Sequence, residues 1–242
     1  MKKITFFIII ILFLLINVNA QVKKNYDSPY IGQFAPSFKA LTTLGTINFP
    51  DDYFTKWKIL FSHPADFTPV CTSEIIELAT KQEDFIKLNT ALIVISTDGL
   101  NSHIEWVKSI ESIVFKDKES VKIKFPIVAD VNTEISKQYN LLRKDVSERK
   151  DMRAVIFIDP NNKIRAILNY PENIGRNISE IERILVALQT ADKMEILTPA
   201  NWKSGDDVLI PSPKSMEESE KLKTKNKSTY YNLTWYMWYM KL

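Results

Sequence analysis

Short apolar runs that alternate with helical patterns constrain the fold of this 242-residue chain more than any other feature of its sequence. Lys58–Ser62 and Ala91–Ser96 have the length and the continuous apolar character of strands that are buried on both faces. Between them, Cys71–Leu88 carries apolar side chains near helical spacing. The pattern predicts a strand, a helix and a second strand in succession.

The rest of this region continues the pattern and ends in a hairpin. Arg153–Ile158 and Lys163–Leu168 are apolar runs that flank the turn sequence Asp159–Asn162. The other predicted elements are a helix over Asn101–Ile110 with Asn101 or Ser102 as its cap, a strand over Phe125–Ala129, and helices over Asn132–Leu142 and Ser179–Leu188. Strands that alternate with helices before a hairpin predict an α/β sandwich with a mixed central sheet.

Composition excludes several kinds of site. The 32 basic and 29 acidic residues are too balanced for a nucleic-acid surface, so we expect no nucleic-acid partner. One cysteine excludes an intrachain disulfide, a CxxC redox pair and a cysteine-rich zinc site. With only two histidines, the sequence also argues against a multi-histidine metal centre, and we predict no bound metal.

The first twenty residues have the layout of a secretory signal peptide. Lys2 and Lys3 precede an apolar run, Ile4–Ile16, and Asn17–Ala20 follows with residues suited to cleavage after Ala20. The run is shorter than the roughly 20 residues of a membrane-spanning helix, although an uncleaved anchor is the alternative. We therefore expect an exported protein, periplasmic or secreted.

Changes in composition divide the chain into four parts. We predict a signal peptide over 1–20, a polar lead over 21–30, the main α/β domain over 31–193 and a C-terminal arm over 194–242. Within the arm, three prolines in Thr198–Pro213 favour extended chain, and the charged Lys214–Lys227 favours a solvated helix or loop. The aromatic Tyr230–Leu242 favours a packed or partner-covering strand over a membrane-surface role.

Candidate chemistry concentrates between His63 and Glu74, directly after the first predicted strand. Thr68 suits an N-cap and Pro69 the first helical position, which places Cys71 in the first turn of the helix. A helix N-terminus stabilises a thiolate, and its free N–H groups can bind an oxyanion beside the sulfur. The alternative is a capped helix with an incidental buried thiol. His103, at the start of a later helix, is expected to be structural or on the surface.

The segment Pro64-x-x-x-Thr68-x-x-Cys71 resembles the active-site motif of the peroxiredoxins, and its surroundings are similar to the one-cysteine (type 6) branch. The resemblance extends from about Ile31 to Pro213 and includes three further segments: Arg153–Pro160, Tyr170–Asn177 and Thr198–Trp202. It implies a thioredoxin-like fold with a C-terminal arm, a homodimer as the basic unit with a higher oligomer as the alternative, and reduction of hydrogen peroxide or organic hydroperoxides without metal, heme or flavin.

The resemblance also assigns roles to individual residues. Cys71 is implied to be the nucleophile that attacks the peroxide and becomes a sulfenic acid. Thr68 is implied to hydrogen-bond the peroxide and the sulfur, and Arg153 to stabilise the thiolate and the charge that moves onto the peroxide oxygens. Because the chain has no second cysteine, an external thiol, thioredoxin-like or of low molecular weight, is expected to close the cycle.

The same resemblance implies a set of residues around the pocket. Arg176 is expected to border it, paired with Glu74, and Pro64 to shield the thiolate from water. His63 matches a histidine that lies near the cysteine in this branch. A different class of function, a non-catalytic holdase or interaction module on the same fold, is the alternative. A thiol–disulfide oxidoreductase is disfavoured because it would normally need CxxC.

Overall fold

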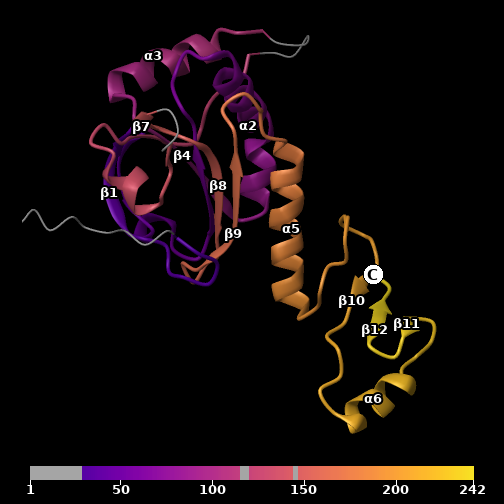
Figure 1. The fold of residues 1–242 in the computed structure, drawn as a ribbon. Coiled ribbons are helices and arrows are strands. Elements are labelled where there is room, and N and C mark those ends of the chain that lie inside the picture. Colours follow the sequence, from indigo (N-terminus) through magenta and orange to yellow (C-terminus); the bar gives the residue numbers. More distant parts are fainter. Residues whose placement is uncertain (1–28, 115–119, 144–146) are drawn as a thin grey trace, which may run out of the picture.

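The computed structural model describes residues 29–114, 120–143 and 147–242. The predicted signal peptide and all but the last two residues of the predicted lead lie outside the described residues. A seven-stranded sheet forms the centre, in the order β2-β1-β5-β4-β3-β8-β9 (Figure 1). Its strands are β1 (Phe38–Thr42), β2 (Gly45–Phe49), β3 (Trp57–Ser62), β4 (Thr90–Ser96), β5 (Ile127–Ala129), β8 (Arg153–Ile158) and β9 (Ile164–Tyr170).

The sheet is mixed, as the sequence predicts. Strands β3, β4 and β5 are parallel, while β8 pairs antiparallel with β3 and forms the predicted hairpin with β9. The helices are α2 (Pro69–Lys87), α3 (Leu100–Glu111), α4 (Glu134–Gln138), α5 (Ile178–Met194) and, in the arm, α6 (Met216–Lys223), with a 3-10 turn, η1, at Asp51–Tyr53. A two-stranded sheet of β6 (Leu142–Arg143) and β7 (Ser147–Asp151) lies outside the main sheet. None of the helices in the described ranges is long and apolar enough to cross a membrane.

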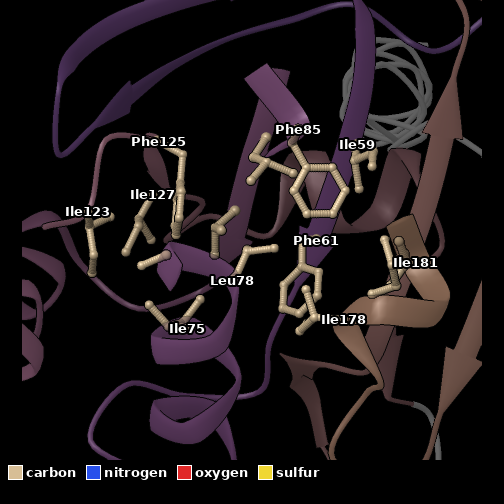
Figure 2. Packing of buried hydrophobic residues seen from close by; sticks show 14 of the residues in the cluster. Ile59, Phe61, Ile75, Leu78, Phe85, Ile123, Phe125, Ile127, Ile178 and Ile181 are labelled. Carbon is tan, nitrogen blue, oxygen red and sulfur yellow. The ribbon is translucent and has the colours of Figure 1, made fainter. Parts of the chain in front are cut away.

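Both faces of the central strands are buried, which explains their continuous apolar sequences. In β3, Ile59 and Phe61 face one cluster of buried side chains, and Leu60 faces the other. Figure 2 shows the first cluster, in which residues of β3, α2, β5 and α5 meet. Side chains alternate across a strand, so burial of both faces favours apolar residues at successive positions. The buried polar residues of β3 are hydrogen-bonded, Lys58 to Asn162 Oδ1 and Ser62 to the Met152 carbonyl. This packing fixes the strand ends that carry the candidate site.

Several predicted boundaries are wrong. Helix α5 continues beyond the predicted Leu188 to Met194, and β5 begins at Ile127 instead of Phe125. Neither Asn101 nor Ser102 caps α3, because the helix begins one residue earlier and Gly99 occupies the N-cap without a side-chain bond. The helix predicted over Asn132–Leu142 is only five residues long, Glu134–Gln138. Asn140 then adopts a left-handed backbone with φ 51°, which ends the helical path and lets the chain enter β6.

The C-terminal arm forms a small unit beside the end of α5. It contains α6 and a three-stranded sheet of β10 (Val208–Leu209), β12 (Met237–Met240) and β11 (Tyr230–Thr234), so the aromatic end of the chain is strand, as predicted. Figure 1 shows this unit projecting from the main domain at the end of α5. The buried Trp202 joins the two, since it packs in a cluster with Val186 and Ala191 of α5, and Arg183 of that helix donates to its carbonyl at 3.0 Å.

Candidate active site

The candidate nucleophile lies where β3 ends and α2 begins. Cys71 occupies the first turn of α2 and is fully buried. Thr68 takes the N-cap position, as predicted, but its side chain does not cap the helix: its hydroxyl donates to the Ala65 carbonyl at 2.9 Å. Pro64 is buried in the connecting loop. The helix start expected from Thr68-Pro69 is thus present. The expected hydrogen bond from Thr68 to the sulfur is not, because the hydroxyl donates its one proton to Ala65.

The register of β8 brings Arg153 to the same place. Phe61 of β3 pairs with Val155 of β8 in an antiparallel ladder. If this register is continued by two residues, Arg153 lies opposite His63, the first residue after β3. A residue 82 positions away in the sequence therefore reaches the thiol: Arg153 Nη1 lies 3.3 Å from Cys71 Sγ.

The carboxylate of Glu74, one turn after Cys71, forms salt bridges with both Arg153 and Arg176. Arg153 Nη1 donates to Glu74 Oε2 at 2.7 Å, and Arg176 Nη2 donates to the same oxygen at 2.8 Å. Arg176 also donates to Glu74 Oε1, from its backbone N at 2.8 Å and from Nε at 2.9 Å. The expected pairing of Arg176 with Glu74 is present, and the carboxylate holds both guanidinium groups in place.

Arg176 is buried at the start of α5 and tied to the sheet. Its Nη1 donates to the carbonyls of Ser62 and Ala154, each at 2.8 Å, and its guanidinium carbon lies 3.3 Å from the ring centre of Phe61. Burial lowers the pKa of Arg176 from its usual value, and the bonds to Glu74 oppose this shift. The residue links β3, β8 and α5 around the pocket.

The buried charges of Arg153, Arg176 and Glu74 do not balance among themselves. Arg153 and Arg176 carry two positive charges, and Glu74 supplies one negative charge, all on buried side chains. A buried charge is costly unless an opposite charge balances it. Since Cys71 Sγ accepts from Arg153, its thiolate form brings these four groups to neutrality. The arrangement can therefore stabilise a thiolate and the negative charge that leaves it.

A second buried cluster lies directly beside this one. His63 Nε2 lies 3.0 Å from Asp66 Oδ1, and His103 Nδ1 lies 2.8 Å from Asp66 Oδ2. The His63 ring packs on Trp106 at 4.9 Å between centres, and Trp106 Nε1 donates to the hydroxyl of Thr72, the neighbour of Cys71. Both histidines are fully buried, so His103 is structural in this sense and is not on the surface.

Sequence reasoning missed the participation of Asp66 and His103 in this cluster. Asp66 lies three residues after His63, a spacing that lets side chains meet in a turn, and this is the only local signal. His103 comes from another helix, and nothing in a single sequence pairs it with Asp66.

One group among the described residues has the composition of a metal site. His63, Asp66 and Asp98 place one ligand atom each within 4.8 Å of one another. Both Asp66 carboxylate oxygens already face histidine nitrogens, and Asp98 Oδ2 accepts from the Asp66 backbone N at 2.7 Å and from Ser96 Oγ at 3.1 Å. These hydrogen bonds account for the cluster, and we assign no metal to it.

Comparison with known families covers both parts of the chain. Residues 31–167 match the model of the AhpC/TSA family, and residues 187–225 match the C-terminal domain of 1-Cys peroxiredoxin. A peroxiredoxin of Methanosarcina mazei is 49% identical over 210 residues, which cover 86% of this chain and 96% of that protein. A peroxiredoxin of Thermotoga maritima is 42% identical over 219 residues, which cover 88% of this chain and 98% of that protein.

Two solved structures have the same fold. A yeast mitochondrial 1-Cys peroxiredoxin matches with a TM-score of 0.77 and 37% identity, over 88% of this chain and 99% of that chain. A cysteine-to-serine mutant of peroxiredoxin 6 from Arenicola marina matches with a TM-score of 0.77 and 30% identity, over 88% of this chain and 97% of that chain. The thioredoxin-like fold and the central sheet are thereby confirmed. This chain belongs to the peroxiredoxin family, whose members are thiol-dependent peroxidases.

Proposed function

We propose that this protein reduces hydrogen peroxide and organic hydroperoxides at Cys71, through a sulfenic acid that an external thiol reduces. The observation that carries the proposal is the position of Arg153, whose Nη1 lies 3.3 Å from Cys71 Sγ and 2.7 Å from Glu74 Oε2. A buried thiol beside a fixed guanidinium is the arrangement that a nucleophilic cysteine needs, because the thiolate is its reactive form.

In the oxidative half-reaction, the Cys71 thiolate attacks one oxygen of the peroxide. A sulfur–oxygen bond forms as the oxygen–oxygen bond breaks, so the cysteine loses two electrons and the peroxide gains them. The leaving oxygen takes a proton and departs as water or, from an organic hydroperoxide, as an alcohol. Arg153 lies where negative charge moves from sulfur to oxygen and stabilises it during the transfer.

Thr68 suits the role of a hydrogen-bond acceptor for the peroxide. Its hydroxyl proton is donated to the Ala65 carbonyl, so the lone pairs of Oγ1 remain for an incoming O–H group. A peroxide oriented in this way presents one oxygen to the sulfur and its proton to Thr68. Pro64, buried in the same loop, supports the proposed shielding of the thiolate from water.

The reductive half-reaction requires a reductant from outside the chain, since Cys71 is its single cysteine. One thiol attacks the sulfenic sulfur, releases water and forms a mixed disulfide. A second thiol then reduces that disulfide, which restores Cys71 and leaves the reductant oxidised. In the yeast mitochondrial 1-Cys peroxiredoxin, thiol resolution proceeds via glutathione and thioredoxin systems, which supports a thiol of either class here.

A cavity beside Arg153 supports organic hydroperoxides as substrates. It has a volume of about 730 Å³, and its lining is half apolar (Leu142, Met152, Tyr170, Pro171) and half polar or charged (Asn140, Arg143, Glu172, Asn173). Arg153 itself donates from Nε to the carbonyl of Glu172, which also lines this cavity. An apolar substituent of a hydroperoxide would find apolar side chains there, close to Arg153.

The peroxidase assay separates the two classes of reductant. Reduced protein is mixed with hydrogen peroxide or cumene hydroperoxide, with either glutathione and glutaredoxin or a thioredoxin system, and peroxide consumption is followed. We expect catalytic turnover with at least one of the two systems and none for Cys71→Ser. The proposal would be overturned if neither system supports turnover and the protein alone consumes no peroxide in a single turnover. The non-catalytic holdase would then be the remaining alternative.

We also propose that the mature chain is exported and forms a homodimer. The signal-peptide layout of residues 1–20 supports export, and the match to the 1-Cys peroxiredoxin C-terminal domain supports the dimer through its family. Amino-terminal sequencing of protein from the native host tests the first, with Gln21 expected as the first residue. Sedimentation velocity tests the second, with twice the chain mass expected and a monomer contradicting it.

A further inference from the structure

The hydrogen bonds among His63, Asp66 and His103, here called the Asp66 cluster, indicate which ring nitrogens carry protons. His103 Nε2 lies 3.2 Å from the carbonyl oxygen of Val128 in β5. A carbonyl oxygen can only accept, so this ring nitrogen carries a proton. The other nitrogen, Nδ1, faces Asp66 Oδ2 at 2.8 Å. If the carboxylate is ionised, Nδ1 must donate as well, and His103 is then a doubly protonated, positively charged ring.

Asp66 has the surroundings of an ionised carboxylate. Burial opposes its ionisation, but the hydrogen bonds from His103 and His63 outweigh this and hold the pKa of Asp66 well below its usual range. Its two oxygens face one histidine each, at 2.8 Å and 3.0 Å. The nearby Asp98 carboxylate faces the Asp66 backbone N rather than its side chain. A positive charge on one of the two histidines would balance the Asp66 carboxylate.

The position of the arginines decides which histidine carries that charge. His63 directly follows Ser62, whose carbonyl accepts from Arg176, so a charged His63 would lie beside the buried guanidinium groups. Burial lowers the pKa of His63, the hydrogen bond to Asp66 and its charge oppose this, and the charges of His103 and then of Arg176 lower the pKa further. His103 lies on the other side of Asp66, against the neutral carbonyl of Val128. A positive charge is therefore more favourable on His103 than on His63.

We propose that His103 is a positioning residue: as the charged partner of Asp66, it holds His63 neutral, with the proton on Nε2 and a lone pair on Nδ1. His63 Nδ1 is fully buried and has no hydrogen-bond partner among the described residues, as expected for a lone pair in a fixed ring. The consequence for the site is electrostatic. A neutral His63 leaves Glu74 and the Cys71 thiolate as the charges that balance the two arginines.

The two histidines of the chain allow a direct test by nitrogen-15 NMR of the reduced, histidine-labelled protein. Four ring-nitrogen signals are expected, and the ring whose protons show nuclear Overhauser contacts to Trp106 is His63. At neutral pH, we expect both nitrogens of His103 to be protonated and only Nε2 of His63. A non-protonated nitrogen in His103, or a doubly protonated His63, would overturn the proposal. No variant is needed, so misfolding cannot obscure the result.

A variant extends the test. His103→Asn keeps an amide that can donate to Asp66 but removes the charge, so His63 should take up the second proton. We expect the Nδ1 signal of His63 to move into the protonated range, whereas Glu105→Gln, an exposed change on the same helix, leaves all four signals in place. A folded His103→Asn protein whose His63 stays neutral contradicts the proposal. The inference rests on the proposed function in taking Cys71 as the reacting group. These spectra need no peroxide, so a failed peroxidase assay and a failed proton assignment remain distinct results.

Discussion

A single nitrogen of Arg153 contacts both the nucleophile and a buried carboxylate: Nη1 lies 3.3 Å from Cys71 Sγ and 2.7 Å from Glu74 Oε2. Its Nε donates to the Glu172 carbonyl at 2.8 Å, which fixes the plane of the guanidinium. The thiol and the carboxylate therefore share one cation. Any change that moves or removes it acts on the reactivity of Cys71 and on the stability of the buried cluster together.

Removal of this cation should slow the oxidation of Cys71. In Arg153→Met, the thiolate loses a charge-assisted hydrogen bond, and such bonds contribute about 1.5–3 kcal/mol. If that contribution acts fully in the transition state, the rate constant for oxidation falls about 10- to 150-fold. Stopped-flow tryptophan fluorescence measures the constant over a range of pH. An unchanged rate would remove Arg153 from the mechanism.

Arg153→Lys is the matched variant, since it keeps the charge and loses the planar fork. A lysine ammonium is a point charge and cannot reproduce the three directed contacts of the guanidinium. We expect an oxidation rate between those of the wild type and Arg153→Met. A lysine variant as slow as the methionine variant would show that geometry, rather than charge, is decisive.

Loss of the Glu74 charge should destabilise the fold. Glu74→Gln leaves Arg153 and Arg176 buried without their shared carboxylate, and such a broken pair costs about 3–5 kcal/mol. Urea unfolding of the reduced protein measures the free energy of unfolding. Glu182→Gln is the control, because its pair with Lys81 is partly exposed, and we expect a loss below about 1 kcal/mol there. Equal losses in the two variants would contradict the account of the buried cluster.

Asp151 should make the protein less stable as the pH rises. Burial, and then the nearby charges of Asp130 and Asp98, raise the pKa of Asp151 to about 8, although the Ser136 side chain opposes the shift. Ser136 Oγ donates its proton to Asp130 Oδ2 at 2.6 Å, so neither Asp151 oxygen has a hydrogen-bond partner in the described part of the chain and burial dominates. Since the folded state holds this proton more tightly than the unfolded state, stability from this group falls between about pH 4 and pH 8. The slope is roughly 1.4 kcal/mol per pH unit.

Asp151→Asn tests this dependence, because asparagine does not ionise. We expect the variant to gain stability relative to the wild type as the pH is raised from 5 to 8, measured by urea unfolding at each pH. The difference between the two proteins should level off above about pH 8. A difference that does not change with pH would place the titration elsewhere.

Much of the fold and the site could be predicted because local sequence determines it. The apolar runs of β3, β4 and β8 are continuous since both faces of these strands are buried. Thr68-Pro69 begins α2 and so places Cys71 in its first turn. In contrast, the sequence around Arg153 and Arg176 does not indicate their role. Only the resemblance to a family predicted that they lie near Cys71.

The features that escaped prediction depend on contacts between distant segments or on single backbone angles. The pairing of His103 with Asp66 joins α3 to the loop after β3, and periodicity marks His103 only as a helical residue. The early end of α4 depends on the left-handed backbone of Asn140, which a short apolar pattern does not reveal. The hydroxyl of Thr68 turns to Ala65 instead of capping the helix, although the residue type suits a cap.

The most direct test of the central claim is the stopped-flow reaction of reduced protein with one equivalent of hydrogen peroxide, followed by mass spectrometry of the product. We predict stoichiometric oxidation at Cys71 to a sulfenic acid, which a dimedone probe traps, with a rate constant far above that of free cysteine and no reaction in Cys71→Ser. A rate constant equal to that of free cysteine would contradict the account.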